Sequence, residues 1–428
     1  MAVERFPSYK YILILFLFEL GFALKFNLIG VISISELFLL FYVPTVILPK
    51  VCWKSSKDLR NITIAYIILL LFQILSEYMI GNELTNSLKG VAITVVSYFH
   101  FIFLIYYLSR WKKLILILLL SQIFMRLFSE VAVEEQTIED VIHGEAAAYL
   151  KFYISPIVIL IFLCLSVMLT TKKFPLLFSF LGVILVVLGA RSSGGMAFVA
   201  GLVTYMISHR LVVRNKKRFI ISLVILCVIA YSCYVYYVNQ VLSGAITSGN
   251  NRQLFLCENP YNPLELLMAG RSEMWVGWQA FMDKFWFGHG AWPYDSTGKY
   301  QRMMYAMHDE LSKFTLNTHY LIPSHSVLVG SGMMNGVFAF VTMAYILYFF
   351  IKRGVLSFIH CERKYKLVLV YYVFDLLWTA FFSPQSHFRL SMPIAFAIIF
   401  VIHASIRTNV EHKNTVQPAQ ADGGCSVG

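Results

Sequence analysis

Apolar runs long enough to cross a lipid bilayer recur along almost the whole of this chain, and they constrain its fold more than any motif does. A membrane-spanning helix needs about 20 apolar residues, and in lipid a single run of this kind satisfies its backbone only as a helix. We therefore expect an all-α, polytopic membrane bundle of about twelve helices. The predicted spans are 10–25, 28–49, 61–80, 90–109, 113–129, 152–170, 174–190, 193–209, 219–240, 324–350, 366–382 and 390–406.

The composition supports a chain that lies in the membrane along most of its length. Of the 428 residues, 58% are hydrophobic and 14% are charged, whereas soluble domains carry about 25% charged residues. The formal net charge of +12 could indicate a nucleic-acid partner. However, no basic patch is interleaved with aromatic residues on a soluble face. The lipid bilayer is therefore the expected partner, and nucleic acid is not.

The positions of the basic residues predict an orientation. If the amino terminus is inside, 23 of the 35 lysines and arginines fall in the inner segments. Basic residues are enriched in cytoplasmic loops, so both termini are expected in the cytoplasm. The outer side then carries the 129–151 loop, the turn at Arg191, a long late loop and the turn from Ser383 to Arg389.

Four regions follow from this topology. Residues 1–240 hold helices one to nine, 241–323 form the long outer loop, 324–408 hold the last three helices, and 409–428 form a polar, disordered cytoplasmic tail. Within the loop, Ser272 to Trp286 and Tyr300 to Phe314 have the periodicity of amphipathic helices. Such helices could lie in the membrane interface or simply cap the bundle, and the sequence leaves both possibilities open.

Arg191 stands between two apolar runs, in Leu-Gly-Ala-Arg-Ser-Ser-Gly-Gly. An arginine at this depth is costly unless it faces a cavity or an anion. Ser192 and the two glycines that follow open a helix, whose free amides and positive end favour anions. Arg191 and Ser192 are therefore candidates for an anion site. The alternative is an arginine that snorkels to the outer interface.

Arg271 begins the first loop helix, in Gly-Arg-Ser-Glu-Met-Trp. A cation at a helix start opposes the helix dipole, which a surface arginine tolerates and an anion-binding arginine uses. Two arginines on one face suit a diphosphate, because the guanidinium fork matches phosphate oxygens. Glu273 is a further candidate at this site, or it pairs with Arg271 across the helix start.

His325 lies in Pro-Ser-His-Ser, where the long loop returns to the membrane. An imidazole at this edge can accept a proton near neutral pH, or it is a hydrogen-bonded interface residue. His387 and Arg389 face the same compartment and could contact a phosphate or a sugar.

Four acidic residues, Glu19, Glu36, Glu77 and Asp375, fall within predicted spans. Such acids are functional candidates, although a hydrogen-bonded structural role is equally open for each. The seven cysteines show no CxxC or Cys/His spacing, so we expect no metal site, and no cofactor motif stands out.

Three features in order resemble the bacterial O-antigen polymerases and O-antigen ligases, which are membrane glycosyltransferases. The first is the Arg-Ser-Ser-Gly-Gly turn at 191–195. The second is the arginine-led helix at 270–275 that continues to Phe-Trp-Phe-Gly-His-Gly at 285–290. The third is His-Ser at 325–326, followed by Gly332 and Asn-Gly-Val-Phe at 335–338.

The resemblance implies a donor saccharide on undecaprenyl diphosphate, transferred with inversion and without metal at the periplasmic face of the bacterial inner membrane. Arg191 and Arg271 would stabilise the diphosphate leaving group, and His325 would deprotonate the acceptor hydroxyl. We expect an O-antigen polymerase that extends the next lipid-linked repeat, possible partners being a chain-length regulator and a flippase. The alternatives are a ligase that transfers the glycan to lipid A-core, or a saccharide-lipid flippase.

Overall fold

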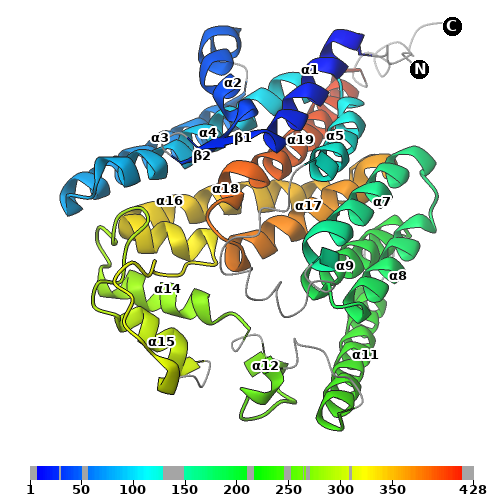
Figure 1. Ribbon diagram of the computed structural model, residues 1–428. Helices are drawn as coiled ribbons and strands as arrows, with labels where there is room; N and C mark the ends of the chain where they lie inside the picture. The colour runs from blue at the N-terminus through cyan, green and yellow to red at the C-terminus, as the bar shows by residue number, and fades with distance from the viewer. Residues whose placement is uncertain are drawn as a thin grey trace, which may run out of the picture.

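The protein is a helical bundle with almost no sheet, as the sequence predicts. The computed structural model describes residues 7–27, 30–50, 56–128, 149–209, 216–244, 252–263, 265–266, 270–307 and 311–416 (Figure 1). Most of the predicted 129–151 loop and residues 417–428 of the predicted tail lie outside this part. The last helix ends at Val416, so it extends into the predicted tail.

The α-helices, in chain order, are α1 (Tyr9–Leu20), α2 (Ile34–Tyr42), α3 (Lys57–Ile80), α4 (Leu84–Leu108), α5 (Leu114–Phe128), α7 (Ser155–Leu169), α8 (Phe174–Val187), α9 (Arg191–Ser208), α11 (Lys216–Leu242), α12 (Arg252–Phe255), α14 (Ser272–Asp283), α15 (Lys299–Met307), α16 (Val327–Ser357), α17 (Arg363–Phe382), α18 (His387–Leu390) and α19 (Met392–Val416). Short helical turns are η1 (Gly21–Ala23), η2 (Val43–Ile47), η3 (Leu48–Lys50), η4 (Leu150–Ile154) and η6 (Leu311–Lys313). Strands β1 (Lys25–Asn27) and β2 (Val31–Ser33) form an antiparallel hairpin.

Within the described residues, six helical segments are long and apolar enough to cross a membrane. They are Lys57–Ile80, Leu84–Leu108, Leu150–Leu169, Val327–Ser357, Arg363–Phe382 and His387–Arg407. Leu114–Phe128 and Phe174–Val187 are shorter apolar helices. The other predicted spans also contain helix, in α1, α2, α9 and α11, but they are not among these six, so the predicted number of twelve spans is not confirmed. The membrane character follows from the six long helices.

Polar residues mark where several of these helices begin and end. The Ser56 hydroxyl accepts a hydrogen bond from Leu59 N at 3.2 Å and caps α3. Gly81, with φ 68°, ends the same helix in the left-handed conformation that glycine favours. Ser326 caps α16 by accepting from Val329 N at 3.1 Å. These caps satisfy backbone groups that a helix end leaves without partners.

Helix α4 lies at the centre of the bundle, since it buries residues on most of its sides. Its Phe101 packs edge to face on Phe350 of α16, and Phe350 stacks on Phe396 of α19 with ring centroids 4.1 Å apart. All three rings are fully buried. A helix that is apolar on most of its sides belongs inside a bundle, which explains why α4 packs against α2, α3, α18 and α19.

Helix α16 is interrupted at Gly336, where φ is 78° and ψ is −174°. Ser326, just before the helix, donates to Ala380 O of α17 at 2.9 Å, and Gly354, near its other end, packs against Val373 of the same helix. A straight α-helix would separate Ser326 from Gly354 by about 40 Å, whereas Val373 and Ala380 are only about 10 Å apart along α17. The first part of α16 is therefore turned back sharply at Gly336 (Figure 1).

One end of the bundle is fastened by ion pairs, and we call it the ionic end. Arg353 Nη2 of α16 lies 2.6 Å from Asp58 Oδ1 of α3, and Arg407 Nη1 of α19 lies 3.4 Å from Asp58 Oδ2. Lys112 Nζ lies 2.6 Å from Glu362 Oε1. These residues come from segments that the sequence predicts on one side of the membrane, and the structure brings them together.

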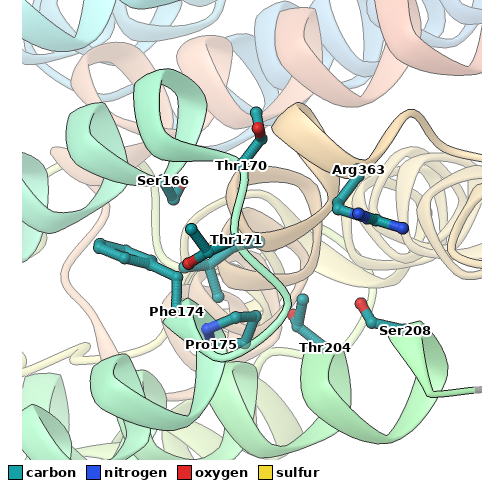
Figure 2. A pocket seen from close by; sticks show the side chains of 9 residues that line it. Ser166, Thr170, Thr171, Phe174, Pro175, Thr204, Ser208 and Arg363 are labelled. Atoms are coloured by element: carbon teal, nitrogen blue, oxygen red, sulfur yellow. The ribbon is translucent and has the colours of Figure 1, made fainter.

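Helices α9 and α17 run in opposite directions along the bundle. Thr204 and Ser208, near the end of α9, line a small cleft with Arg363, the first residue of α17 (Figure 2). Arg363 follows Glu362 of the ionic end directly. Arg191 at the start of α9 and Phe382 at the end of α17 therefore lie at the opposite end. We call this the loop end, because Arg271, directly before α14, contacts α17 there, and α14 and the segment that follows it contact α16.

Candidate functional site

The loop end is organised by the segment 285–290, which fills the bend in α16. His289 N donates to Met333 O and Gly290 N donates to Met334 O, each at 2.8 Å. Val337 N, on the other side of the bend, donates to Phe285 O at 2.8 Å. The loop backbone thus satisfies groups that the interruption at Gly336 removes from the helix ladder. In interrupted helices that bind ions, the freed carbonyls coordinate the ion. Here the freed carbonyls accept hydrogen bonds from the backbone of the loop.

Glycine is required on both sides of this contact. A Cβ on Gly288 would lie 2.5 Å from Met334 O, and one on Gly336 would collide with Trp286 O. Both glycines also have positive φ, at 71° and 78°. The two sequence features at 285–290 and 335–338 are therefore parts of one contact, although they lie far apart in the chain.

Arg271 lies directly before α14 and reaches over the last turns of α17. Its guanidinium carbon is 5.1 Å from the ring centroid of Trp378 and 5.5 Å from that of Phe382. Among the described residues no carboxylate forms an ion pair with it. Burial lowers the pKa of Arg271, and the charge of Glu273 partly offsets this. An arginine stays protonated even so, and the result is a partly buried cation held by aromatic faces.

Glu273, predicted to bind substrate, lies in the first turn of α14 near Arg271. It also lies within electrostatic range of Tyr320, in the stretch that leads to α16. Burial, together with the charge of Glu273, raises the pKa of Tyr320 to about 12. Glu273 is therefore close to Arg271 without forming an ion pair with it in the described part of the chain.

His325 reaches the same end of α17 from the other side. The neighbouring Ser326 donates to Ala380 O, which lies in α17 between Trp378 and Phe382. Nδ1 of His325 is buried and has no hydrogen-bond partner among the described residues. A buried nitrogen without a partner costs free energy, so it indicates a place for a proton or a ligand group. The structure thus brings Arg271 and His325 to one helix end.

Arg191 lies at the loop end but apart from this pair. Its Nη2 donates a hydrogen bond to the hydroxyl of Tyr237 on α11, and its guanidinium carbon lies 5.3 Å from the Tyr237 ring centroid. Ser192 beside it is partly exposed in the first turn of α9. No contact in the described residues joins Arg191 or Ser192 to Arg271 or His325. Arg191 nevertheless resembles Arg271 in one respect: among the described residues, each contacts an aromatic ring of its own and not a carboxylate.

Arg389 and His387 lie on α18, a single turn that several elements hold in place. Arg389 Nη1 lies 3.3 Å from Glu36 Oε1, and Nη2 donates to Val31 O at 3.2 Å. Nδ1 of His100 lies 3.4 Å from the backbone oxygen of Arg389. Arg389 is therefore engaged by a carboxylate, unlike Arg191 and Arg271, and this favours a structural role for its charge.

His387 connects α18 to the site. Its Nδ1 lies 2.9 Å from the Ser391 hydroxyl, and the residue is within electrostatic range of both His325 and Arg126. Arg126, near the end of α5, also interacts with Asp375 of α17. Arg126 was not among the predicted functional residues. The signal was present, since an arginine inside a predicted span is a functional candidate.

The remaining acids in predicted spans have identifiable partners. Glu19 Oε1 lies 3.5 Å from His100 Nε2, both residues being fully buried, and Gln122 donates to its other oxygen. Glu77 accepts from Ala291 N at 2.7 Å and from Asn82 Nδ2 at 2.7 Å. Glu77 therefore ties the loop to the end of α3.

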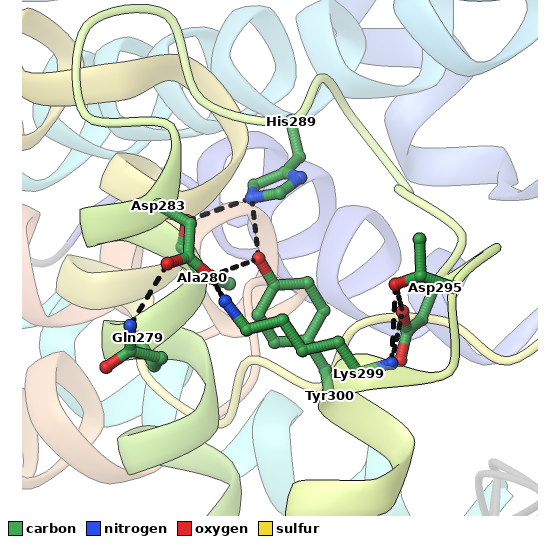
Figure 3. Close-up of polar contacts among 8 residues, drawn as sticks. Gln279, Ala280, Asp283, His289, Asp295, Lys299 and Tyr300 are labelled. Carbon is green, nitrogen blue, oxygen red and sulfur yellow. Dashed lines mark hydrogen bonds and ion pairs between the residues drawn. The ribbon is translucent and has the colours of Figure 1, made fainter.

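A second polar cluster, which sequence analysis missed, joins α14 to α15 (Figure 3). The Tyr300 hydroxyl donates to Asp283 Oδ2 at 2.7 Å, and Lys299 Nζ pairs with the same oxygen. Burial alone would raise the pKa of Asp283, but these two hydrogen bonds and the charge of Lys299 hold it below its usual value. His289 Nε2 lies 2.9 Å from Ala280 O. Burial lowers the pKa of His289, which favours the neutral ring.

Taken together, the loop end offers a cation and an imidazole beside the last turn of α17. Such a pair can bind an anionic group and accept a proton close to it. Among the described residues, no group of three His, Cys, Asp or Glu side chains could hold a metal ion. A scan against protein-family models found no match to this chain, and a search of curated proteins found none.

Proposed function

We propose that this chain is a membrane glycosyltransferase, an O-antigen polymerase, that transfers a saccharide from undecaprenyl diphosphate to the next lipid-linked repeat. The observation that carries the proposal is the pairing at the end of α17. Arg271 is held there by aromatic rings, with no carboxylate in ion-pair range among the described residues, and the neighbouring His325 has a buried Nδ1 without a partner. A charge held by rings remains available to an anionic substrate.

In this mechanism the acceptor hydroxyl attacks the anomeric carbon, and the bond from that carbon to the diphosphate oxygen breaks. The electron pair goes to the diphosphate, whose growing charge Arg271 stabilises. The hydroxyl proton goes to Nδ1 of His325. Attack from the face opposite the leaving group inverts the anomeric centre. Arg191 contributes positive potential from the start of α9.

The proposal includes a topology. The chain crosses the bacterial inner membrane about twelve times, with both termini in the cytoplasm and the loop end facing the periplasm. Supporting this, the basic residues of the ionic end come from loops that the positive-inside rule assigns to the cytoplasm. A lipid-linked donor would then reach Arg271 from the outer leaflet.

The test uses a strain that lacks the gene, complemented with variants of the full chain. Arg271→Ala should reduce polymer formation about 100-fold or more, since losing one preorganised donor to a developing anion has effects of this size. His325→Ala should act similarly. Arg302→Ala is the matched control, because Arg302 is also a loop arginine over an aromatic ring, Phe314, but is exposed and lies outside the site.

The sugar ladder distinguishes the outcomes. Single-repeat product in the deleted strain and in the Arg271→Ala strain supports the polymerase. Free lipid-linked polymer with bare core would mean that the enzyme is a ligase. A full ladder with Arg271→Ala at normal protein abundance would overturn the catalytic proposal.

A further inference from the structure

Helix α14 presents apolar side chains on two opposite faces. One face packs against α16 and buries Val276, Ala280 and Phe281. On the other, Trp275 is 37% exposed, Trp278 39% and Met282 48%, and Trp286 just beyond the helix is 62% exposed. A capping helix in contact with water would carry polar residues on this second face. The exposed face therefore needs an apolar neighbour.

The spacing shows that these residues form one stripe. Each residue turns an α-helix by about 100°, so positions 275, 278 and 282 fall within about 60° of one another, and Trp286 follows just beyond the helix. Positions 276 and 280 lie on the opposite side by the same rule, and Phe281 lies between the two faces. We call Trp275, Trp278, Met282 and Trp286 the tryptophan stripe. Its inner edge meets the packed face, because Trp278 contacts Phe281 and Phe340 edge to face.

The tryptophan stripe is continuous with an apolar surface of α16. Trp286 lies against Phe338, with ring centroids 6.2 Å apart, at the first turn beyond the bend. From Phe338, which is 42% exposed, an exposed apolar row continues through Val341, Tyr345 and Tyr348 along the same helix. This part of α16 belongs to a segment long and apolar enough to cross a membrane. The surface that would face lipid on α16 therefore runs on to α14.

We propose that the tryptophan stripe lies in the membrane interface, so that α14 is an interfacial helix whose outer face contacts lipid. Tryptophan is enriched at the level of the headgroups, where its ring is buried and its N–H remains solvated. The exposed Lys284, next to the stripe, can reach lipid phosphates from the same position. The inference rests on exposure and continuity and does not depend on the proposed reaction. It resolves the two alternatives for this helix, since one face caps the bundle and the other meets the bilayer.

The test is fluorescence quenching of the full chain reconstituted in phosphatidylcholine vesicles that carry bromine at shallow or deep acyl positions. The variant Trp275→Phe/Trp278→Phe keeps both rings aromatic and apolar. Trp292→Phe is the control, because Trp292 is partly buried against the core and its Nε1 is buried. We expect shallow bromine to quench the wild type more than deep bromine. The double variant should lose part of this difference, since Trp286 of the tryptophan stripe remains, and the control should keep all of it.

A second quencher, the water-soluble iodide ion, tests whether the tryptophan stripe is instead exposed to water. If the tryptophan stripe faces water, a glycan or a protein partner, iodide will quench Trp275 and Trp278, and the bromine difference will be the same in the wild type and the double variant. That result would overturn the proposal. Circular dichroism of each variant shows whether the fold is kept.

Discussion

The two ends of the bundle hold their cations in different ways. At the ionic end Arg353 and Arg407 share Asp58, although Arg353 also stacks on Phe349 with its guanidinium carbon 3.4 Å from the ring centroid. At the loop end Arg191 and Arg271 contact aromatic rings, and no described carboxylate forms an ion pair with either. A carboxylate neutralises the charge that it binds, whereas a ring leaves the charge available. The difference separates cations that hold helices together from cations placed for a ligand.

Arg389 sharpens this comparison from within the loop end. It was predicted to bind substrate, but its guanidinium is engaged by Glu36 and by the Val31 carbonyl. Arg389 therefore resembles the arginines of the ionic end, because its partner is a carboxylate. Position on one side of the membrane does not make an arginine a ligand-binding residue, and the chemical nature of its partner is the better guide.

The largest effect on stability is expected from Asp58→Ala. This change leaves two arginines at the ionic end without their shared carboxylate, which is partly buried, so the cost lies between that of an exposed and that of a buried pair. The free energy of unfolding in detergent should fall by about 2 kcal/mol, while the activity per folded molecule stays unchanged. Glu362→Ala is the matched control at the more exposed pair with Lys112, where a change of at most about 1 kcal/mol is expected.

The comparison fails if Asp58→Ala removes activity from protein that is still folded. In that case the ionic end would take part in the reaction, and the division into structural and ligand-binding cations would be wrong.

A smaller effect, on activity, is expected from Trp378→Leu. The ring supports Arg271, and a cation–π contact in a desolvated position is worth about 1–2 kcal/mol, or about tenfold in rate. Trp378→Phe should lose less, because a ring remains. Phe349→Leu, beneath Arg353 at the ionic end, should leave the rate unchanged. Equal losses from Trp378→Leu and Phe349→Leu would remove the distinction between the two ends.

Much of the fold follows from local pattern. Apolar runs of sufficient length predict helices wherever they occur, and residues such as Ser56 and Gly81 mark their ends by capping chemistry that involves only neighbours in sequence. The interest of Arg191 was also predictable, because a cation between apolar runs is costly. Arg271 was predictable because a cation at a helix start opposes the helix dipole. These inferences need no knowledge of which segments meet.

The bend at Gly336 and its pairing with 285–290 could not be predicted in this way. Glycine is common in membrane helices, so Gly336 gives no local signal of an interruption. The bend forms because the backbone at 285–290 supplies replacement hydrogen bonds and Ser76 donates to Phe287 O. That is a property of three distant segments together. The resemblance named both glycine-containing stretches but not their contact.

The smallest expected effect is on the pH dependence of stability, and it tests the contact between His289 and α14. Burial holds the pKa of His289 below its ordinary value, so the unfolded chain binds the extra proton first. This contribution to stability is present above the unfolded pKa of about 6.5 and is lost as pH falls from there towards the lower folded value. In the wild type, the denaturant concentration at the midpoint of unfolding should therefore increase when the pH is raised from about 5 to about 7. His289→Gln should make that rise shallower, whereas His319→Gln, at an exposed loop position, should leave it unchanged. An identical rise in all three proteins would show that the neutral ring of His289 does not fasten the loop to α14.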